Sequence, residues 1–245
     1  QGEKQMTLGR KNFRYGKSHY ILSAVDLPVT GQVITASKEE PYLAIKLSFQ
    51  PSDWLSVVEE MEDLPKFNKT KRRAMNVSES QSELVQAFHR LVLLIDEPHH
   101  QKMLAPIIKK EIIYWLIVGP LGPMLTQMLT KNQHGQQMRQ VIQYMIDHYS
   151  ESFTVRDLAG RVNTSVATFH RYFKEMTTLT PIQFQKQVRL QEARQKVLRN
   201  QESITEIAFQ VGYDSPSQFS REYTRYFGQS PSLDRQTIKQ TTDLP

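Results

Sequence analysis

Residues 203–231 read SITEIAFQVGYDSPSQFSREYTRYFGQSP, and residues 154–181 read TVRDLAGRVNTSVATFHRYFKEMTTLTP. The two stretches align as one pattern in which Phe169 matches Phe219, and one extra residue lies in the turn of the second copy. Each copy predicts a short helix, a tight turn and a second helix that begins at a capping serine, Ser165 or Ser215. The chain therefore repeats a helix-turn-helix unit.

The second helix of each copy has two chemically different faces. Apolar residues recur at i, i+4 and i+7 and predict a buried face, formed by Phe169, Phe173 and Met176 in one copy and by Phe219, Tyr223 and Tyr226 in the other. The opposite face carries the small Ala167 together with cations and hydrogen-bonding groups, which are His170, Arg171 and Lys174 in one copy and Ser217, Gln218, Arg221 and Arg225 in the other. Side chains of these types can reach base edges in a DNA major groove.

The segment between the copies predicts a helix of useful length. Pro181 stands at the first helical position, and apolar residues recur through to Arg199. At about 1.5 Å per residue this helix spans roughly 28 Å, close to the ~34 Å between successive major grooves on one face of B-DNA. The repeat is thus expected to read two successive major grooves.

Two alternatives stay open at this point. Helical hairpins are common scaffolds, so the repeat would also suit a helical protein-interaction module. Arg171 and Arg221 would equally suit salt bridges or contacts with DNA phosphates, which receive most protein–DNA hydrogen bonds.

Residues 136–245 resemble the DNA-binding domain of the AraC/XylS family of bacterial transcription regulators. The resemblance is carried by Asp157-Leu-Ala159, Arg171-Tyr-Phe-Lys174, Thr180-Pro181, Arg189-Leu190 with Ala193, Ile207-Ala208, Val211-Gly-Tyr-Asp-Ser215, Phe219, Arg221, Tyr223, Phe227-Gly228 and Ser230-Pro231. It implies an all-α domain of seven helices with two helix-turn-helix motifs. It further implies a regulator of transcription, with double-stranded DNA and RNA polymerase as partners. We expect an activator, although the sequence leaves open whether the effect is activation or repression.

The same resemblance assigns base-contacting positions to this sequence. They are Ala167, His170 and Arg171 for the first groove, and Pro216, Ser217, Gln218 and Arg221 for the second. The sequence departs from the family pattern at Asp234, where an aromatic residue is usual, and at Thr224, where a lysine is usual.

The region before the repeat begins with β-type sequence. Extended segments are predicted at residues 20–25, 31–35 and 42–49, which are rich in β-branched and aromatic residues and bounded by Pro and Gly. A helix is predicted over residues 52–61 with Ser52 as its cap. Residues 63–80 show no periodicity and predict a loop or a weak strand.

Two further helices are predicted before residue 119. The first starts after Ser82, stops before Pro98 and carries an apolar stripe formed by Leu84, Phe88, Leu91 and Ile95. We expect this stripe to form a dimer interface, although the domain's own core would also accommodate it. The second is predicted from residue 105 to residue 118. His99 and His100 precede it and predict a surface turn, since no metal-site spacing surrounds them.

This N-terminal region is similar to the effector domain that one branch of the same family carries. The matching residues are 20–31, 41–44, 96–98, 104–106 and 111–112. The resemblance implies a cupin-like β-barrel followed by helices, a small-molecule effector and a homodimer, and it leaves the effector pocket unassigned. The chain begins at Gln1 rather than Met, and family members usually carry strands upstream, so we expect a truncated or processed chain with an incomplete barrel.

The composition of the chain limits the classes of protein and the kinds of partner that are compatible with it. The chain has 245 residues, a formal net charge of +6 and no cysteine, which favours an anionic partner and excludes disulfides and thiol catalysis. No apolar run approaches the ~18 residues that a membrane span needs. Since the chain has no cysteine and no secretory leader opens it, we expect a cytoplasmic, nucleoid-associated protein. No cofactor, metal or catalytic motif is found, and a cupin enzyme fused to a DNA reader stays an alternative to a non-enzymatic regulator. The expected fold is α+β, with an effector domain at residues 1–129, a linker at 130–136 and a DNA-binding domain at 137–245.

Overall fold

The computed structural model describes residues 1–61, 73–129 and 133–242, and it divides into two compact units. One comprises residues 1–139 with 175–178, and the other comprises residues 140–174 with 179–245. The predicted linker, residues 130–136, lies partly outside the described residues, and helix α5 begins at Gln133. Its boundaries stay a prediction.

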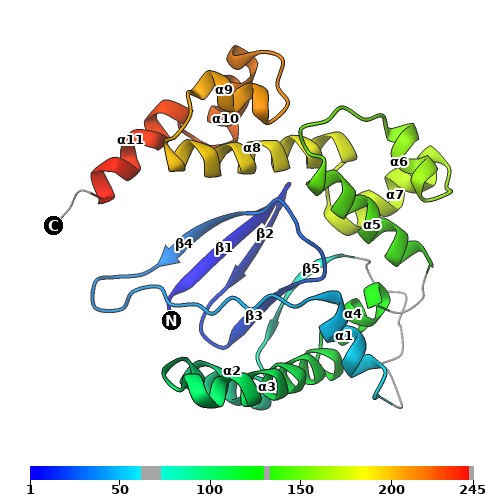
Figure 1. Cartoon of the computed structure of the whole chain (residues 1–245), viewed down its shortest axis with the longest axis vertical. Helices are drawn as coiled ribbons and strands as arrows, with labels where there is room; N and C mark the ends of the chain where they lie inside the picture. The colour runs from blue at the N-terminus through cyan, green and yellow to red at the C-terminus, as the bar shows by residue number, and fades with distance from the viewer. Residues whose placement is uncertain (62–72, 130–132, 243–245) are drawn as a thin grey trace. The chain divides into compact units, whose positions relative to one another are not determined.

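The first unit contains two open antiparallel sheets. Strand β1 (Glu3–Leu8) lies between β2 (Lys11–Tyr15) and β4 (Thr30–Thr35), with Met6 opposite Phe13 and Gly31 (Figure 1). Strand β3 (His19–Ser23) pairs with β5 (Met75–Glu79), with Ile21 opposite Val77. The segments predicted at 20–25 and 31–35 are therefore strands β3 and β4. The described strands do not close into a barrel, so the cupin-like barrel is not confirmed.

The helices of this unit lie on both sides of β5 in the chain: α1 precedes it and the others follow it. They are α1 (Pro51–Val58), α2 (Ser82–Leu93), a 3-10 turn (Leu94–Asp96), α3 (Pro98–Val118) and α4 (Gly122–Leu129). Helices α2 and α3 run side by side in Figure 1 and pack against each other. Their shared core includes Leu84, Ile112 and Leu116 and extends to Leu22 of β3 and Val57 of α1.

Three local predictions for this unit are wrong. Residues 42–49 form no strand, because a strand needs a continuous hydrogen-bonded neighbour and, among the described residues, this segment pairs only at Leu43 with Gln1. The cap of α1 is Gln50 rather than Ser52, and Asp53 Oδ2 accepts from the backbone N–H of Gln50 at 2.7 Å. His99 and His100 lie in the first turn of α3, because Pro98 occupies the first helical position and starts the helix.

The apolar stripe of α2 is divided between core and surface. Leu84 is only 3% exposed and belongs to the core, whereas Phe88 and Leu91 are half-buried against that core. Ile95, in the 3-10 turn, is 67% exposed. Most of this stripe therefore packs within its own unit.

The second unit is helical. It contains residues 140–147 of helix α5 (Gln133–Asp147) and most of α7 (Val166–Thr177). Its other helices are α6 (Val155–Arg161), α8 (Pro181–Arg199), α9 (Ile204–Gln210), α10 (Pro216–Phe227) and α11 (Pro231–Thr242). Helix α8 has the bounds expected from the sequence (Figure 1). Its residues Leu190, Ala193 and Val197 pack with Ile207 and Phe219 into one core.

Candidate nucleic-acid interface

Both copies of the repeat start with the same capping arrangement. In the first copy Asp157 N–H donates to Thr154 Oγ1 at 3.2 Å, and Thr154 N–H donates to Asp157 Oδ2 at 3.0 Å. Ser203 and Glu206 make the equivalent pair of hydrogen bonds in the second copy, at 3.1 and 2.8 Å. These reciprocal bonds satisfy backbone N–H groups that the first turn of a helix leaves free.

The turns between the helices also match. Asn163 in the first copy and Gly212 in the second have positive φ angles of 49° and 89°. In the second turn the N–H of Tyr213 donates to the carbonyl of Ala208 at 3.0 Å. A left-handed residue reverses the chain at the end of a helix, and glycine and asparagine adopt it at least cost. This turn directs the chain into the second helix.

The second helices, α7 and α10, are fixed by their caps and their buried faces. Ser165 Oγ accepts from Thr168 N–H at 3.2 Å, and Ser215 Oγ accepts from Gln218 N–H at 3.3 Å. The predicted buried faces are confirmed at Phe169, Phe173, Met176, Phe219 and Tyr223, and Tyr226 is half-buried. Each helix therefore turns its opposite face outward.

All nine predicted DNA-binding residues have exposed surface. Ala167, Arg171, Lys174, Ser217, Gln218, Arg221 and Arg225 are exposed, and His170 and Pro216 are partly exposed. Within the described part of the chain, no salt bridge engages Arg171 or Arg221. Arg171 instead lies over the Tyr172 ring, with 5.0 Å from its Cζ to the ring centroid. Both guanidinium groups are thus available to an anionic partner, and their contact with DNA stays a prediction.

Glu222 of α10 is a residue that sequence reasoning missed. Its carboxylate accepts from Lys186 Nζ at 2.7 Å, from Tyr213 Oη at 2.9 Å and from the Gln218 side-chain amide at 3.3 Å. Partial burial favours a higher pKa, but these donors, led by Lys186, outweigh it and hold the pKa of Glu222 below its ordinary value. The ionised carboxylate connects α8 to α10 and holds one of the predicted base-reading side chains.

Arg189 of α8 joins three segments of the second unit. Its guanidinium donates to the carbonyls of Tyr149 at 2.7 Å, Gly212 at 2.6 Å and Glu151 at 3.0 Å. It thereby ties the chain after α5 and the turn of the second copy to the connecting helix. Its place between apolar positions of α8 was the available signal in the sequence, since an arginine there needs acceptors.

Asp234, where the sequence departs from the family pattern, is 2% exposed and fully paired. It accepts from Arg194 Nε at 2.8 Å, from Tyr223 Oη at 2.6 Å and from the Gln229 side-chain amide at 2.7 Å. Burial acts to raise its pKa, yet the Arg194 and Tyr223 hydrogen bonds dominate and lower it. The carboxylate therefore fixes α11 to α8 and α10 where an aromatic residue would pack.

The described residues contain little that suggests other kinds of site. Across 1–61, 73–129 and 133–242, no three His, Cys, Asp or Glu residues are arranged to hold a metal ion. None of the described helices combines the length and the apolar composition needed to cross a bilayer.

Fold and site together define a tandem helix-turn-helix protein with a separate β-containing N-terminal unit. Family comparison gives the same division. Residues 1–124 match the N-terminus of AraC-type transcriptional regulators, and residues 158–237 match a helix-turn-helix domain. The chain therefore belongs to the AraC family of DNA-binding transcriptional regulators.

Curated relatives include regulators of the same type. The chain is 33% identical over 99 residues to the HTH-type transcriptional activator RhaS of Klebsiella pneumoniae, which covers 40% of this chain and 36% of RhaS. It is 30% identical over 146 residues to the HTH-type transcriptional regulator ExsA of Pseudomonas aeruginosa, which covers 59% of this chain and 51% of ExsA. The chain thus spans about half or less of the length of these relatives.

A solved structure resembles nearly the whole chain. The crystal structure of an apo ToxT variant from Vibrio cholerae matches with a TM-score of 0.59 at 12% sequence identity, over 96% of this chain and 85% of that chain. At this identity the match supports the fold alone: a mixed helix and sheet region followed by a helical helix-turn-helix domain.

Proposed function

We propose that this protein is a sequence-specific transcription regulator that reads two successive major grooves. The observation that supports this most directly is that α7 and α10 are held in the second unit by the same set of local interactions. The same caps, the same left-handed turn position and the same buried aromatic face leave a polar, cationic face outward on each helix. That face suits base edges and phosphates together.

The proposal predicts a strong dependence of DNA affinity on salt. Cations that neutralise phosphates release counterions, so affinity falls steeply as salt is added. Fluorescence anisotropy of the whole chain with labelled duplex, between about 50 and 200 mM salt, measures this slope. An affinity for DNA that is absent or independent of salt would instead favour the protein-interaction module.

We further infer that the N-terminal unit binds a small-molecule effector and that its sheets belong to a cupin-like barrel. The match of residues 1–124 to the N-terminus of AraC-type regulators supports this assignment. Screening a metabolite library for compounds that raise the unfolding temperature of the whole chain tests it, because a ligand of the native state stabilises that state. If no compound does so, the effector assignment fails while the DNA-reading proposal still stands.

The same proposal covers the DNA-binding domain as a whole. This domain is proposed to comprise residues 137–245, to consist of seven helices and to act on DNA in the cytoplasm. The relative RhaS is named a transcriptional activator, and activation is proposed for this chain too. RNA polymerase is then its proposed protein partner. We assign the chain no catalytic activity.

A homodimer completes the proposal. Of the residues predicted to form its interface, Leu84 is buried within its own unit, and Ile95 offers the largest exposed fraction. Helix α2 thus supplies only part of an apolar surface that a second subunit could cover, and the neighbouring helix α3 has further exposed apolar residues.

A further inference from the structure

Glu222 of α10 lies beside one of the predicted base-reading residues and is itself largely buried. Its side chain is 12% exposed, whereas Gln218, one turn earlier on the same helix, is exposed. Gln218 Nε2 donates to Glu222 Oε1 at 3.3 Å. Residues four apart on a helix are neighbours on its surface, so their spacing explains this contact. The carboxylate is therefore placed to act on DNA through the amide that it holds.

The contact decides which way round the Gln218 amide lies. An ionised carboxylate only accepts hydrogen bonds, so the amide nitrogen faces it and the amide oxygen does not. Burial favours the neutral acid, but Lys186 Nζ at 2.7 Å and Tyr213 Oη at 2.9 Å donate to Glu222 and hold its pKa below the ordinary value. These donors come from α8 and from the turn before α10, so the carboxylate itself is fixed in place.

One N–H hydrogen and the carbonyl oxygen of Gln218 remain available to a partner. An amide nitrogen carries two hydrogens, and Glu222 takes one of them. The major-groove edge of adenine presents the N6–H donor beside the N7 acceptor, which matches the remaining pair. The edge of guanine presents two acceptors, O6 and N7, and the fixed carbonyl oxygen would oppose one of them. Held in this orientation, Gln218 is complementary to adenine and not to guanine.

The first copy of the repeat has different residues at these two positions. Thr168 aligns with Gln218, and Tyr172 aligns with Glu222. Neither residue of the first copy is an amide or a carboxylate. The orientation imposed by Glu222 therefore belongs to the second copy.

We propose that Glu222 is a positioning residue: it orients the Gln218 amide, so that the half-site read by α10 takes an A·T pair in preference to a G·C pair at one position. This inference rests on the proposed reading of two major grooves and adds the base that one reading side chain selects. The half-site read by α7 has no such requirement, so the two motifs of the binding site are expected to differ.

Selection from random double-stranded DNA by the whole chain tests the proposal. Gln218→Ala identifies the position that Gln218 reads, because base preference should disappear there and remain elsewhere. At this position the parent chain is expected to prefer an A·T pair over a G·C pair by about tenfold or more, as one bidentate contact would. A preference for guanine there would overturn the proposal without any change at Glu222.

Glu222→Gln tests the positioning role itself. The substitution removes the negative charge with little change in shape, and the new amide both donates and accepts, so the Gln218 amide is no longer held one way round. We expect most of the A·T preference at the Gln218 position to be lost and the preferences at the other positions to remain. A loosened α10 would instead weaken every position of its half-site alike, and that result would overturn the positioning role.

A double-mutant cycle shows whether the two residues act together. In a chain that already carries Gln218→Ala, Glu222→Gln should change no base preference, because the side chain through which it acts is gone. A full A·T preference in the single variant Glu222→Gln, or the same change of preference in both backgrounds, would contradict the proposal.

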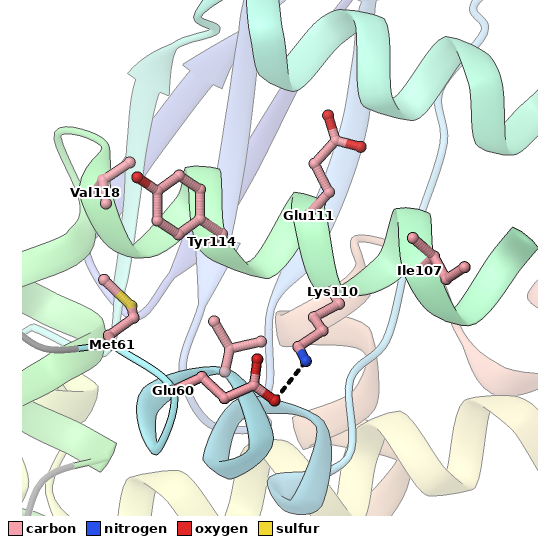
Figure 2. Close-up of a pocket in the computed structure, with 8 residues that line it drawn as sticks. Glu60, Met61, Ile107, Lys110, Glu111, Tyr114 and Val118 are labelled. Carbon is pink, nitrogen blue, oxygen red and sulfur yellow. Dashed lines mark hydrogen bonds and ion pairs between the residues drawn. The ribbon is translucent and has the colours of Figure 1, made fainter.

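Two other carboxylates provide matched controls for the lost charge. Glu202 accepts from Gln210 Nε2 at 2.7 Å and lies 3.9 Å from Lys196 Nζ, so it has the same kinds of partner at residues that are not predicted to read bases. In the first unit Glu60 pairs with Lys110 at 2.5 Å (Figure 2). Glu202→Gln and Glu60→Gln should leave every base preference unchanged. If either shifted the preference as Glu222→Gln does, the effect would belong to charge, and the proposal would fail.

The outcomes also separate this inference from the proposal on which it rests. A parent chain that selects a bipartite site without A·T preference at the Gln218 position would overturn the inference alone. A parent chain that selects no sequence would overturn both.

Discussion

Asp234 shows at the scale of one residue how a polar side chain replaces apolar packing. Three donors surround its buried carboxylate, and each comes from a different part of the second unit. A buried charge without these donors would cost several kcal/mol. The buried carboxylate of Asp234 and its three hydrogen-bond donors therefore depend on one another.

We predict that Asp234→Ala destabilises the protein by about 2 to 4 kcal/mol, because it leaves Arg194 and the Tyr223 hydroxyl without their acceptor. Urea unfolding followed by far-UV circular dichroism measures the loss. Asp214→Ala removes an exposed aspartate of the same unit and should change stability little. Equal effects of the two substitutions would refute the structural role of Asp234.

Acid should also remove the contribution of the Asp234 carboxylate to the free energy of unfolding. The pKa of Asp234 is lower in the folded protein than in the unfolded chain, so its stabilisation is fully present above the unfolded value and is lost as pH falls through the folded value. Unfolding temperatures measured from about pH 6 down to pH 2 should fall less steeply in Asp234→Asn than in the parent. Identical slopes would show that this carboxylate does not titrate as described.

The two exposed arginines carry the DNA-reading proposal at residue scale. Arg171→Ala and Arg221→Ala should each weaken specific DNA binding by about 1 to 3 kcal/mol and relax specificity in one half-site only. Arg199→Ala, an exposed change at the end of α8, is the control for lost charge. A uniform loss over all sequences would assign the arginines to phosphates instead.

At the scale of elements, the turn of the second copy is more constrained than the first helix of the first copy. Gly212 has a φ of 89°, and an added Cβ would meet the Ser150 carbonyl and lie 2.8 Å from Arg189 Cζ. Gly160, inside α6, has open space around the same position.

These two glycines should therefore respond in opposite directions to alanine. Gly212→Ala is expected to destabilise the protein by about 1 to 3 kcal/mol through strain, and Gly160→Ala to stabilise it by about 0.5 to 1 kcal/mol through helix propensity. Thermal unfolding of both variants tests this. If Gly212→Ala were neutral, the close approach of Arg189 to the turn would be wrong.

The accuracy of sequence-based prediction also depends on the element. Helices α7, α8 and α10 could be predicted because caps, period and buried aromatics lie within each segment, so local sequence decides them. Residues 42–49 look like a strand, but pairing depends on a distant neighbour that local sequence does not reveal. Strands β1 and β2 are not predicted from the sequence, because each has only two apolar or aromatic residues among charged and polar ones and so resembles a solvated loop.

The candidate DNA interface could also be predicted only as far as local sequence decides it. The outward faces of α7 and α10 follow from helical period alone. Glu222 and Arg189 did not emerge from the sequence as structural residues, because the partners Lys186 and Gly212 lie more than twenty residues away along the chain. Leu84 was predicted to lie at a dimer interface but is buried in its own unit. The sequence of an apolar stripe does not distinguish burial in the core of the same unit from burial against another subunit.

At the scale of the whole molecule, a DNA-reading unit with two outward helix faces is joined to an N-terminal unit for which we propose effector binding and dimerisation. Dimerisation would bring two such readers together, and each would contribute two helices to DNA. The central claim concerns one chain, however: α7 and α10 read two successive major grooves.

Selection of binding sites from random double-stranded DNA by the purified whole chain tests this claim most directly. The account predicts enrichment of a bipartite site whose two short motifs lie about one helical turn, roughly 10 base pairs, apart. Arg171→Ala and Arg221→Ala should each relax the sequence preference in one motif and leave the other unchanged. Enrichment of a single short motif, or retention of DNA without sequence preference, would contradict it.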